Sequence, residues 1–98
     1  MELRIAFHAA ADREAEEVAD YYEQQLPGLG AEFYHELGTI LNLLSLNPWM
    51  GVSYFGPYRR VLMQRFPFAV YYEVANDRIR VVAVAHQRRM PGYWRGRV

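Results

Sequence analysis

The spacing of hydrophobic positions changes along the chain, and these changes predict the order of its elements. Leu3, Ile5 and Phe7 alternate with polar or small residues, which is the period-two pattern of a short strand. Beyond Asp12, a candidate helix N-cap, apolar residues recur every three or four positions. This stripe predicts an amphipathic helix that ends at the Pro-Gly pair 27–28; its members are Ala15, Val18, Ala19, Tyr22 and Leu26.

A second helical pattern follows directly and stops at the Asn-Pro pair 47–48. Except for the neighbours Ile40 and Leu41, its apolar positions are again separated by three or four residues. They are Leu29, Phe33, Leu37, Ile40, Leu41 and Leu44. A break of so few residues joins two antiparallel helices. The first half of the chain is therefore predicted to be a strand followed by a helical hairpin.

Three strand-like runs occupy the second half of the chain. They cover residues 59–66, 68–74 and 78–85, and a turn-forming Asn-Asp pair separates the last two. The aromatic segment 49–57 has no clear period, and we predict a loop there. Segregated helices and antiparallel strands indicate an α+β fold. We predict a single domain over residues 1–98: one N-terminal strand, an antiparallel helical hairpin, a three-stranded antiparallel meander and a short C-terminal tail.

Composition narrows the classes of function. The chain has 98 residues and no Cys, which excludes disulfides, iron–sulfur clusters, thiolate zinc sites and Cys nucleophiles. His8, His35 and His86 have no metal-ligand spacing, and there is no glycine-rich phosphate loop, so we expect neither a metal nor a small-molecule cofactor. No apolar run approaches the roughly 20 residues that cross a bilayer. With no signal-peptide pattern at its start, we expect a cytoplasmic protein without a membrane partner.

The formal net charge of zero hides a strong asymmetry. Residues 1–50 carry two Arg against nine acidic residues, whereas residues 51–98 carry nine Arg against Glu73 and Asp77. Clustered guanidinium groups produce a positive field that attracts phosphate or carboxylate partners. Alternatively, the two halves neutralise each other across the fold. The charge pattern leaves both interpretations open.

The segment 86–97 has the richest chemistry, with four Arg, one His and two aromatic residues. Guanidinium groups bind phosphate or carboxylate, and aromatic rings stack on bases. Metal-free cleavage of RNA needs a base, cationic donors for the phosphate and an acid. Glu73 either serves as a base or neutralises a neighbouring Arg. Trp94 either takes part in binding or only packs on the domain. If the chain is a nuclease, the candidate catalytic residues are His86, Tyr93, Arg65 and Arg89.

Two stretches carry a resemblance to a known superfamily: Phe66-Pro67-Phe68-Ala69-Val70-Tyr71-Tyr72-Glu73-Val74 and Ile79-Arg80-Val81-Val82-Ala83-Val84-Ala85-His86-Gln87-Arg88-Arg89. With the element order, they resemble the RelE/ParE superfamily of bacterial toxins, the toxin halves of type II toxin–antitoxin modules, over essentially the whole chain. RelE-like members cut messenger RNA in the ribosomal A site, and ParE-like members inhibit DNA gyrase. RNA-cutting members typically have a basic residue where this chain has Ala69. The ending His86-Gln87-Arg88-Arg89 resembles ParE-type plasmid-stabilisation toxins.

The resemblance implies a toxin that binds and inhibits DNA gyrase and is neutralised by a cognate antitoxin. The alternatives are a ribosome-dependent, metal-independent mRNA endoribonuclease and a non-toxic module that only binds a partner. Operator DNA would be bound only indirectly, through the antitoxin. We expect these residues to bind target or antitoxin: Arg59, Arg65, Arg88, Arg89, Trp94 and Arg95.

The resemblance also implies an exposed apolar surface that the antitoxin covers. We expect it to include some of the following residues: Leu43, Leu46, Trp49, Met50 and Tyr54. Removal of residues 91–98 is expected to abolish toxicity with little loss of fold.

Overall fold

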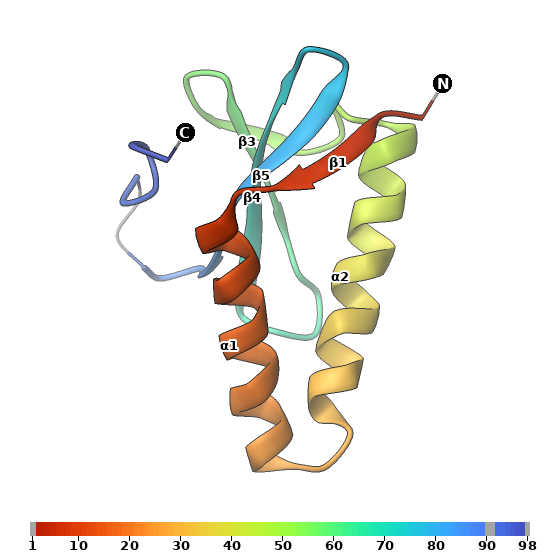
Figure 1. The fold of residues 1–98 in the computed structure, drawn as a ribbon, viewed down its shortest axis with the longest axis vertical. Helices are drawn as coiled ribbons and strands as arrows, with labels where there is room; N and C mark the ends of the chain where they lie inside the picture. The colour runs from red at the N-terminus through yellow and green to blue at the C-terminus, as the bar shows by residue number, and fades with distance from the viewer. Residues whose placement is uncertain (1, 90–91, 98) are drawn as a thin grey trace.

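The computed structural model, which describes residues 2–89 and 92–97, has a five-stranded sheet with a helical hairpin on one face (Figure 1). The predicted α+β class is therefore confirmed. The chain forms one strand, leaves the sheet for two helices and returns for the remaining strands. The elements are β1 (Arg4–Phe7), α1 (Ala9–Gln25), α2 (Leu29–Leu46), β2 (Val52–Phe55), β3 (Tyr58–Leu62), β4 (Phe68–Ala75) and β5 (Arg78–His86).

The strand layout differs from the prediction. The order across the sheet is β1-β5-β4-β3-β2, and β1 lies parallel to β5, with Ile5 opposite Ile79. Instead of three strands, β2 to β5 form a four-stranded antiparallel meander. The additional strand, β2, lies in the aromatic segment where we predicted a loop. It has only four residues, and its register with β3 shifts between Ser53 and Phe55, so it leaves no regular alternation in the sequence.

The first helix begins earlier than predicted. His8, and not Asp12, is the N-cap of α1, because its Nδ1 atom accepts a hydrogen bond from the Ala10 backbone N–H at 3.0 Å. The Ala residues at positions 9–11 are strong helix formers and extend the helix to this point. Asp12 lies in the first turn, where its negative charge is favourable beside the helix dipole.

The predicted helical hairpin is present and closes at Gly28, the left-handed N-cap of α2 with φ of 92°. The Glu23 carboxylate at the end of α1 accepts hydrogen bonds from the backbone N–H groups of Gly28 and Gly30. A Cβ atom at Gly30 would lie 2.6 Å from the Ala19 carbonyl oxygen. The two helices can approach this closely only because position 30 is glycine.

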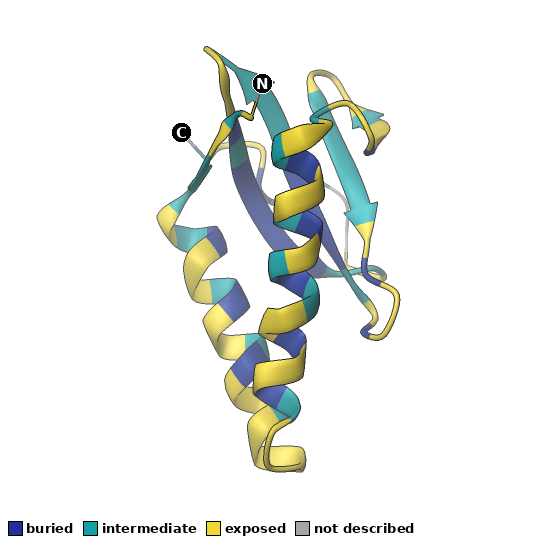
Figure 2. Cartoon of the chain, turned by 90° about the vertical axis from the view of Figure 1, so that its right-hand side faces the viewer, coloured by how far each residue is buried: buried dark blue, intermediate teal, exposed yellow. Residues whose placement is uncertain are grey.

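The sheet is buried on both faces. The helices cover one face, and Figure 2 shows the buried residues on the sides of the helices that face the sheet and along the central strands. On the other face, Ala69, Tyr71, Val82 and Ala85 pack with Trp94 from the end of the chain. A register shift between Tyr71 and Tyr72 changes which side of the sheet the following residues face. Within the described residues, no helix is long and apolar enough to cross a membrane.

Candidate functional site

Residues 92–97, called the C-terminal segment below, lie against the sheet face opposite the helices. Trp94 is 1% exposed, and its ring centroid lies 4.6 Å from that of Tyr58 and 5.2 Å from that of Tyr71. The indole that we predicted as a binding group is therefore part of a core in the folded chain. Of the same stretch, Met90 and Pro91 lie outside the described residues, as do Met1 and Val98.

Glu14 on α1 connects the C-terminal segment to the rest of the fold. Its carboxylate accepts hydrogen bonds from the Tyr93 hydroxyl at 2.7 Å and from both terminal nitrogens of Arg97 at 2.9 and 2.8 Å. The backbone N–H of Val84 on β5 donates to the same carboxylate at 3.1 Å. Arg97 also donates to the carbonyl oxygen of Val82 at 2.8 Å. A bidentate guanidinium–carboxylate pair is among the stronger polar contacts in proteins.

The hydrogen bonds determine the protonation states of this cluster. Partial burial raises the pKa of Glu14, but hydrogen bonds from Arg97, Tyr93 and Val84 outweigh burial and hold it below the ordinary value of 4.5. Burial, and then the bond to the Glu14 carboxylate, raise the pKa of the Tyr93 phenol well above its ordinary value. At neutral pH the cluster therefore contains a carboxylate, a neutral phenol and a guanidinium cation.

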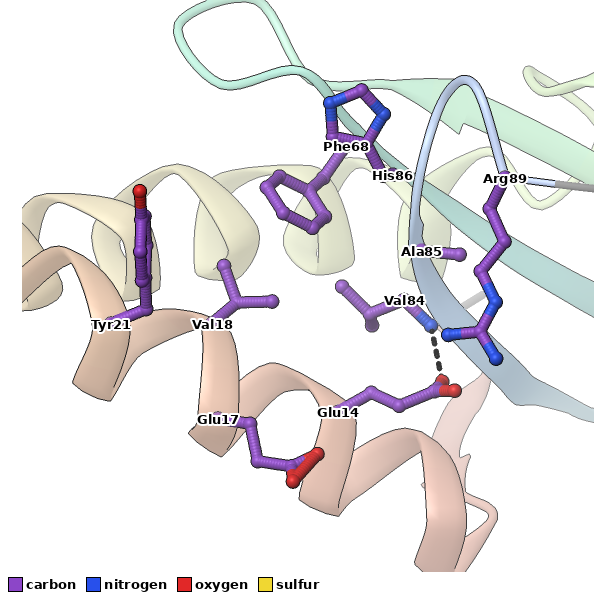
Figure 3. A pocket seen from close by; sticks show the side chains of 9 residues that line it. All are labelled: Glu14, Glu17, Val18, Tyr21, Phe68, Val84, Ala85, His86 and Arg89. Atoms are coloured by element: carbon purple, nitrogen blue, oxygen red, sulfur yellow. Dashed lines mark hydrogen bonds between the residues drawn. The ribbon is translucent and has the colours of Figure 1, made fainter.

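His86 lies at the end of β5, beside a cavity of about 260 Å³ between that strand and α1 (Figure 3). Aliphatic side chains line the inner part of the cavity, and charged side chains lie at its edge. Arg89 and Glu14 are two of these charged residues. His86 accepts a hydrogen bond from the Arg88 backbone N–H at Nδ1, at 3.1 Å, which places the proton of the neutral imidazole on Nε2. The lining residues are Glu14, Glu17, Val18, Tyr21, Phe68, Val84, Ala85, His86 and Arg89.

Three of the four candidate nuclease residues lie near one another. His86 and Arg89 line the same cavity, and the Arg89 guanidinium carbon lies 3.9 Å from the Tyr93 ring centroid. Arg65 is not with them, because it forms an ion pair with Glu32 of α2. Sequence reasoning did not single out Glu14, which lines the same cavity as His86 and Arg89 and accepts a hydrogen bond from Tyr93. Along the chain, Glu14 is only one of several acidic residues in the first helix, and nothing distinguishes it from them.

The predicted binding arginines divide into paired and unpaired groups. Arg65 pairs with Glu32. Arg97, which was not among the predicted binding residues, pairs with Glu14, so the two halves of the chain do partly neutralise each other. Glu73 pairs with Arg80, the neutralising role considered for it. Within the described residues, four of the predicted binding arginines form no ion pair: Arg59, Arg88, Arg89 and Arg95.

Three of these unpaired arginines lie on aromatic rings: Arg89 on Tyr93, as described above, and Arg95 and Arg59 on two further rings. The Arg95 guanidinium carbon is 3.7 Å from the ring centroid of Phe55, and that of Arg59 is 5.1 Å from Trp49. Arg59 also donates to the carbonyl oxygen of Gly51 at 2.7 Å. Stacked guanidinium groups are held in place without losing their charge, and they remain able to bind an anion.

Large apolar side chains are exposed on the C-terminal part of α2, on the segment after it and on β2 and β3, and Met50 and Leu62 share one cavity with Leu43 and another with Val52. We call these exposed side chains the apolar strip: Leu43, Leu46, Trp49, Met50, Val52 and Leu62. Its exposed fractions range from 38% for Met50 to 70% for Val52. Four of the residues predicted to form the antitoxin surface belong to it, whereas Tyr54 is half-buried against Tyr71. Contiguous apolar surface of this kind marks a site of protein interaction.

A metal centre has no support in the described part of the chain. Residues 2–89 and 92–97 contain no group of three or more His, Asp or Glu side chains placed to hold an ion.

The described residues form a two-layer α+β fold that has an arginine-rich C-terminal end and an exposed apolar strip. Residues 5–91 match the sequence model of the ParE toxin of the type II toxin–antitoxin system, parDE. The chain therefore belongs to this toxin family, and the resemblance to the RelE/ParE superfamily is confirmed.

The fold has a solved counterpart in a structure titled "Chromosomal ParDE TA system from P. aeruginosa". The two chains superpose with a TM-score of 0.76 at 15% sequence identity, over 87% of this chain and 96% of the other. At this identity the match shows a shared fold. No curated protein matches the sequence.

Proposed function

We propose that this ParE-family toxin inhibits DNA gyrase by binding it, and that a cognate antitoxin neutralises the toxin. The observation that carries this proposal is the match of residues 5–91 to the ParE toxin family. ParE-like toxins act on gyrase without cutting RNA, and the family assignment supports that branch. Gyrase binding also assigns a role to the unpaired arginines, and it locates the toxin in the cytoplasm.

Glu14 makes the alternative RNA-cutting site unfavourable. An RNA phosphate beside His86 would meet a carboxylate whose pKa is lowered and which is therefore ionised at neutral pH. The Tyr93 hydroxyl already donates a hydrogen bond to Glu14, and its raised pKa makes it a poor general acid and leaves no phenolate at neutral pH to act as a base. Ala69, where RNA-cutting members typically have a basic residue, is fully buried and offers no cation.

The apolar strip is the proposed docking surface for the antitoxin. Arg59 and Arg60 flank it and form no ion pair within the described residues. A partner that places apolar side chains on the strip and acidic side chains beside these arginines would match both its chemistry and its charge. Operator DNA would then be bound through the antitoxin alone, and the pair would act as a stabilisation module for the plasmid that carries it.

Controlled expression in a bacterial host tests the target. We expect DNA synthesis to fail first and DNA-damage signalling to follow, because gyrase poisoning acts on the chromosome. Protein synthesis failing first, with cleaved messenger RNA, would favour the ribosome-dependent nuclease and would contradict the proposal. Cells that grow normally while the folded protein accumulates would indicate the non-toxic partner-binding module.

The docking surface has its own test. Leu46→Asp places a charge at a position that is 66% exposed, so the fold tolerates it, but the apolar contact with the antitoxin is lost. We expect the variant to remain toxic and to escape neutralisation when the antitoxin is co-expressed. Tyr21→Asp, at an exposed aromatic position on α1, is the matched control and should still be neutralised. Full neutralisation of the Leu46 variant would remove the strip from the interface.

A further inference from the structure

The free edge of β5 is closed by side chains and not by a strand. β1 pairs with β5 only as far as Val81, because the chain then turns into α1. Beyond that point, the Arg97 guanidinium bonds to the carbonyl oxygen of Val82, and the Glu14 carboxylate bonds to the N–H of Val84. The pair therefore satisfies backbone groups that would otherwise be exposed at the sheet edge.

The same pair fixes the C-terminal segment. Arg97 carries two of the bonds to Glu14, and its own carbonyl oxygen accepts a bond from Arg80 at 2.9 Å. Tyr93 contributes a further bond to Glu14 from the other end of the segment. Between these two anchors, Trp94 is buried and Arg95 remains exposed on the ring of Phe55.

We propose that Glu14 is a positioning residue: with Arg97 it holds the C-terminal segment on the sheet, and so presents Arg95 to the target without touching the target itself. This inference rests on the proposed function, because Arg95 is one of the residues expected to bind gyrase. The alternative is that the pair only stabilises the fold and that the segment stays closed without it. The two views differ in what happens locally when the pair is broken.

The local test follows Trp94 directly. In a Trp49→Phe background, Trp94 is the only tryptophan, and its low exposure makes it resistant to acrylamide quenching. Glu14→Gln removes the charge that holds Arg97, and we expect quenching to rise towards that of the unfolded chain while far-UV circular dichroism is unchanged. Glu17→Gln removes the same charge one turn later, at an exposed side chain on the rim of the same cavity, and should leave quenching low.

Hydrogen exchange at Val84 gives an independent measurement. In the wild type this amide donates to the Glu14 carboxylate, so its exchange reports whether that carboxylate, which also binds Tyr93 and Arg97, stays at the edge of β5. Loss of one charge-assisted contact corresponds to about a 30-fold faster exchange in Arg97→Gln. Arg97→Lys keeps the charge but not the two-pronged geometry, and it should lie between the wild type and Arg97→Gln. Arg78→Gln, at an exposed arginine at the other end of β5, is the control with no expected change.

Gyrase inhibition, measured on the same variants in an otherwise wild-type chain, completes the test. We expect inhibition to weaken in proportion to the open fraction in Glu14→Gln and Arg97→Gln, and to be unchanged in Glu17→Gln. The inference is overturned if the segment stays closed in both variants, or if it opens and inhibition remains at the wild-type level. A wild-type protein that does not inhibit gyrase overturns the proposed function instead, and the quenching and exchange results still decide whether Glu14 holds the segment.

Discussion

At the scale of single residues, Tyr72 and Gly51 form a close contact that determines the path into β2. The Tyr72 hydroxyl donates to the Pro48 carbonyl oxygen at 2.8 Å and accepts from the Gly51 N–H at 2.9 Å. Tyr72 has no exposed surface. A buried hydroxyl with both a donor and an acceptor partner fixes the chain that leaves α2 against the centre of the sheet.

Gly51→Ala should destabilise the protein. An added Cβ atom would lie 2.5 Å from the Tyr72 hydroxyl oxygen and 3.0 Å from the Arg60 carbonyl oxygen, so the backbone must shift. We expect a loss of about 1–3 kcal/mol in the free energy of unfolding, measured by urea denaturation. Gly38→Ala is the control: no atom lies within 4 Å of its Cβ position in α2, and the change should stabilise the helix by up to about 1 kcal/mol. Equal effects of the two substitutions would contradict this account.

Glu14 makes stability depend on pH in a defined direction. Because its pKa in the folded chain is below the ordinary value of 4.5, the carboxylate contributes stability that is fully present above that value. The contribution is lost as the pH falls through the folded pKa. Urea denaturation should therefore show wild type more stable than Glu14→Gln at neutral pH, with the difference shrinking below pH 4.5. A difference that stays constant into acid would show that the charge of Glu14 does not stabilise the fold.

At the scale of elements, hydrophobic periodicity predicts helices and strands that have one buried face and are long enough to show the repeat. The helical hairpin and the strands β4 and β5 follow directly from the hydrophobic pattern, whereas β3 ends at Leu62, before the end of the predicted run 59–66. β2 could not be found this way, because it has four residues, three of them largely exposed, and an irregular register. The start of α1 was missed because the side chain of His8 acts as the cap, a role more typical of Ser, Thr, Asp or Asn.

The candidate site was predicted in part. The arginine and aromatic residues of the segment 86–97 predict a binding role that stays a prediction, whereas the exposure of four residues of the apolar strip was anticipated. The positions of Trp94 and Glu14 could not be predicted, because they depend on contacts between residues about 80 positions apart, such as the bond from Tyr93 to Glu14. No local pattern in a single sequence contains such a contact.

The C-terminal segment belongs to the fold, contrary to the expectation that its removal costs little stability. Trp94→Ala should lower the free energy of unfolding by about 3–5 kcal/mol, because it empties a site enclosed by Tyr54, Tyr58 and Tyr71. Trp49→Ala removes the same side chain from a position that is 60% exposed and should have a much smaller effect. Similar losses in the two variants would mean that Trp94 is not packed as described.

At the scale of the whole molecule, acidic residues and unpaired arginines lie in different places. The acidic residues are concentrated on the helical hairpin, and the unpaired arginines lie along the sheet and the end of the chain. The apolar strip lies beside the end of α2. Arg88, Arg89 and Arg95 near the end of the chain are the proposed contacts to the target, whereas Arg59 and Arg60 lie beside the strip proposed for the antitoxin.

The charged surface predicts salt-dependent binding. Arg88→Ala with Arg89→Ala should weaken gyrase inhibition, and wild-type inhibition should itself decline as ionic strength rises, because exposed charges are screened over about 10 Å at 0.1 M salt. Arg78→Ala, at an exposed arginine at the far end of β5, is the control and should inhibit like the wild type. Inhibition that is independent of both salt and the double substitution would show that these arginines do not bind an anionic surface of the target.

The most direct measurement of the central claim is DNA supercoiling by purified gyrase in the presence of the purified toxin, with a translated messenger RNA followed in a parallel reaction. We predict that supercoiling is inhibited, that the antitoxin reverses the inhibition, and that the RNA stays intact. Undisturbed gyrase together with RNA cleaved in step with codons would contradict the account, and would make His86 and Tyr93 catalytic residues despite the Glu14 carboxylate that binds Tyr93.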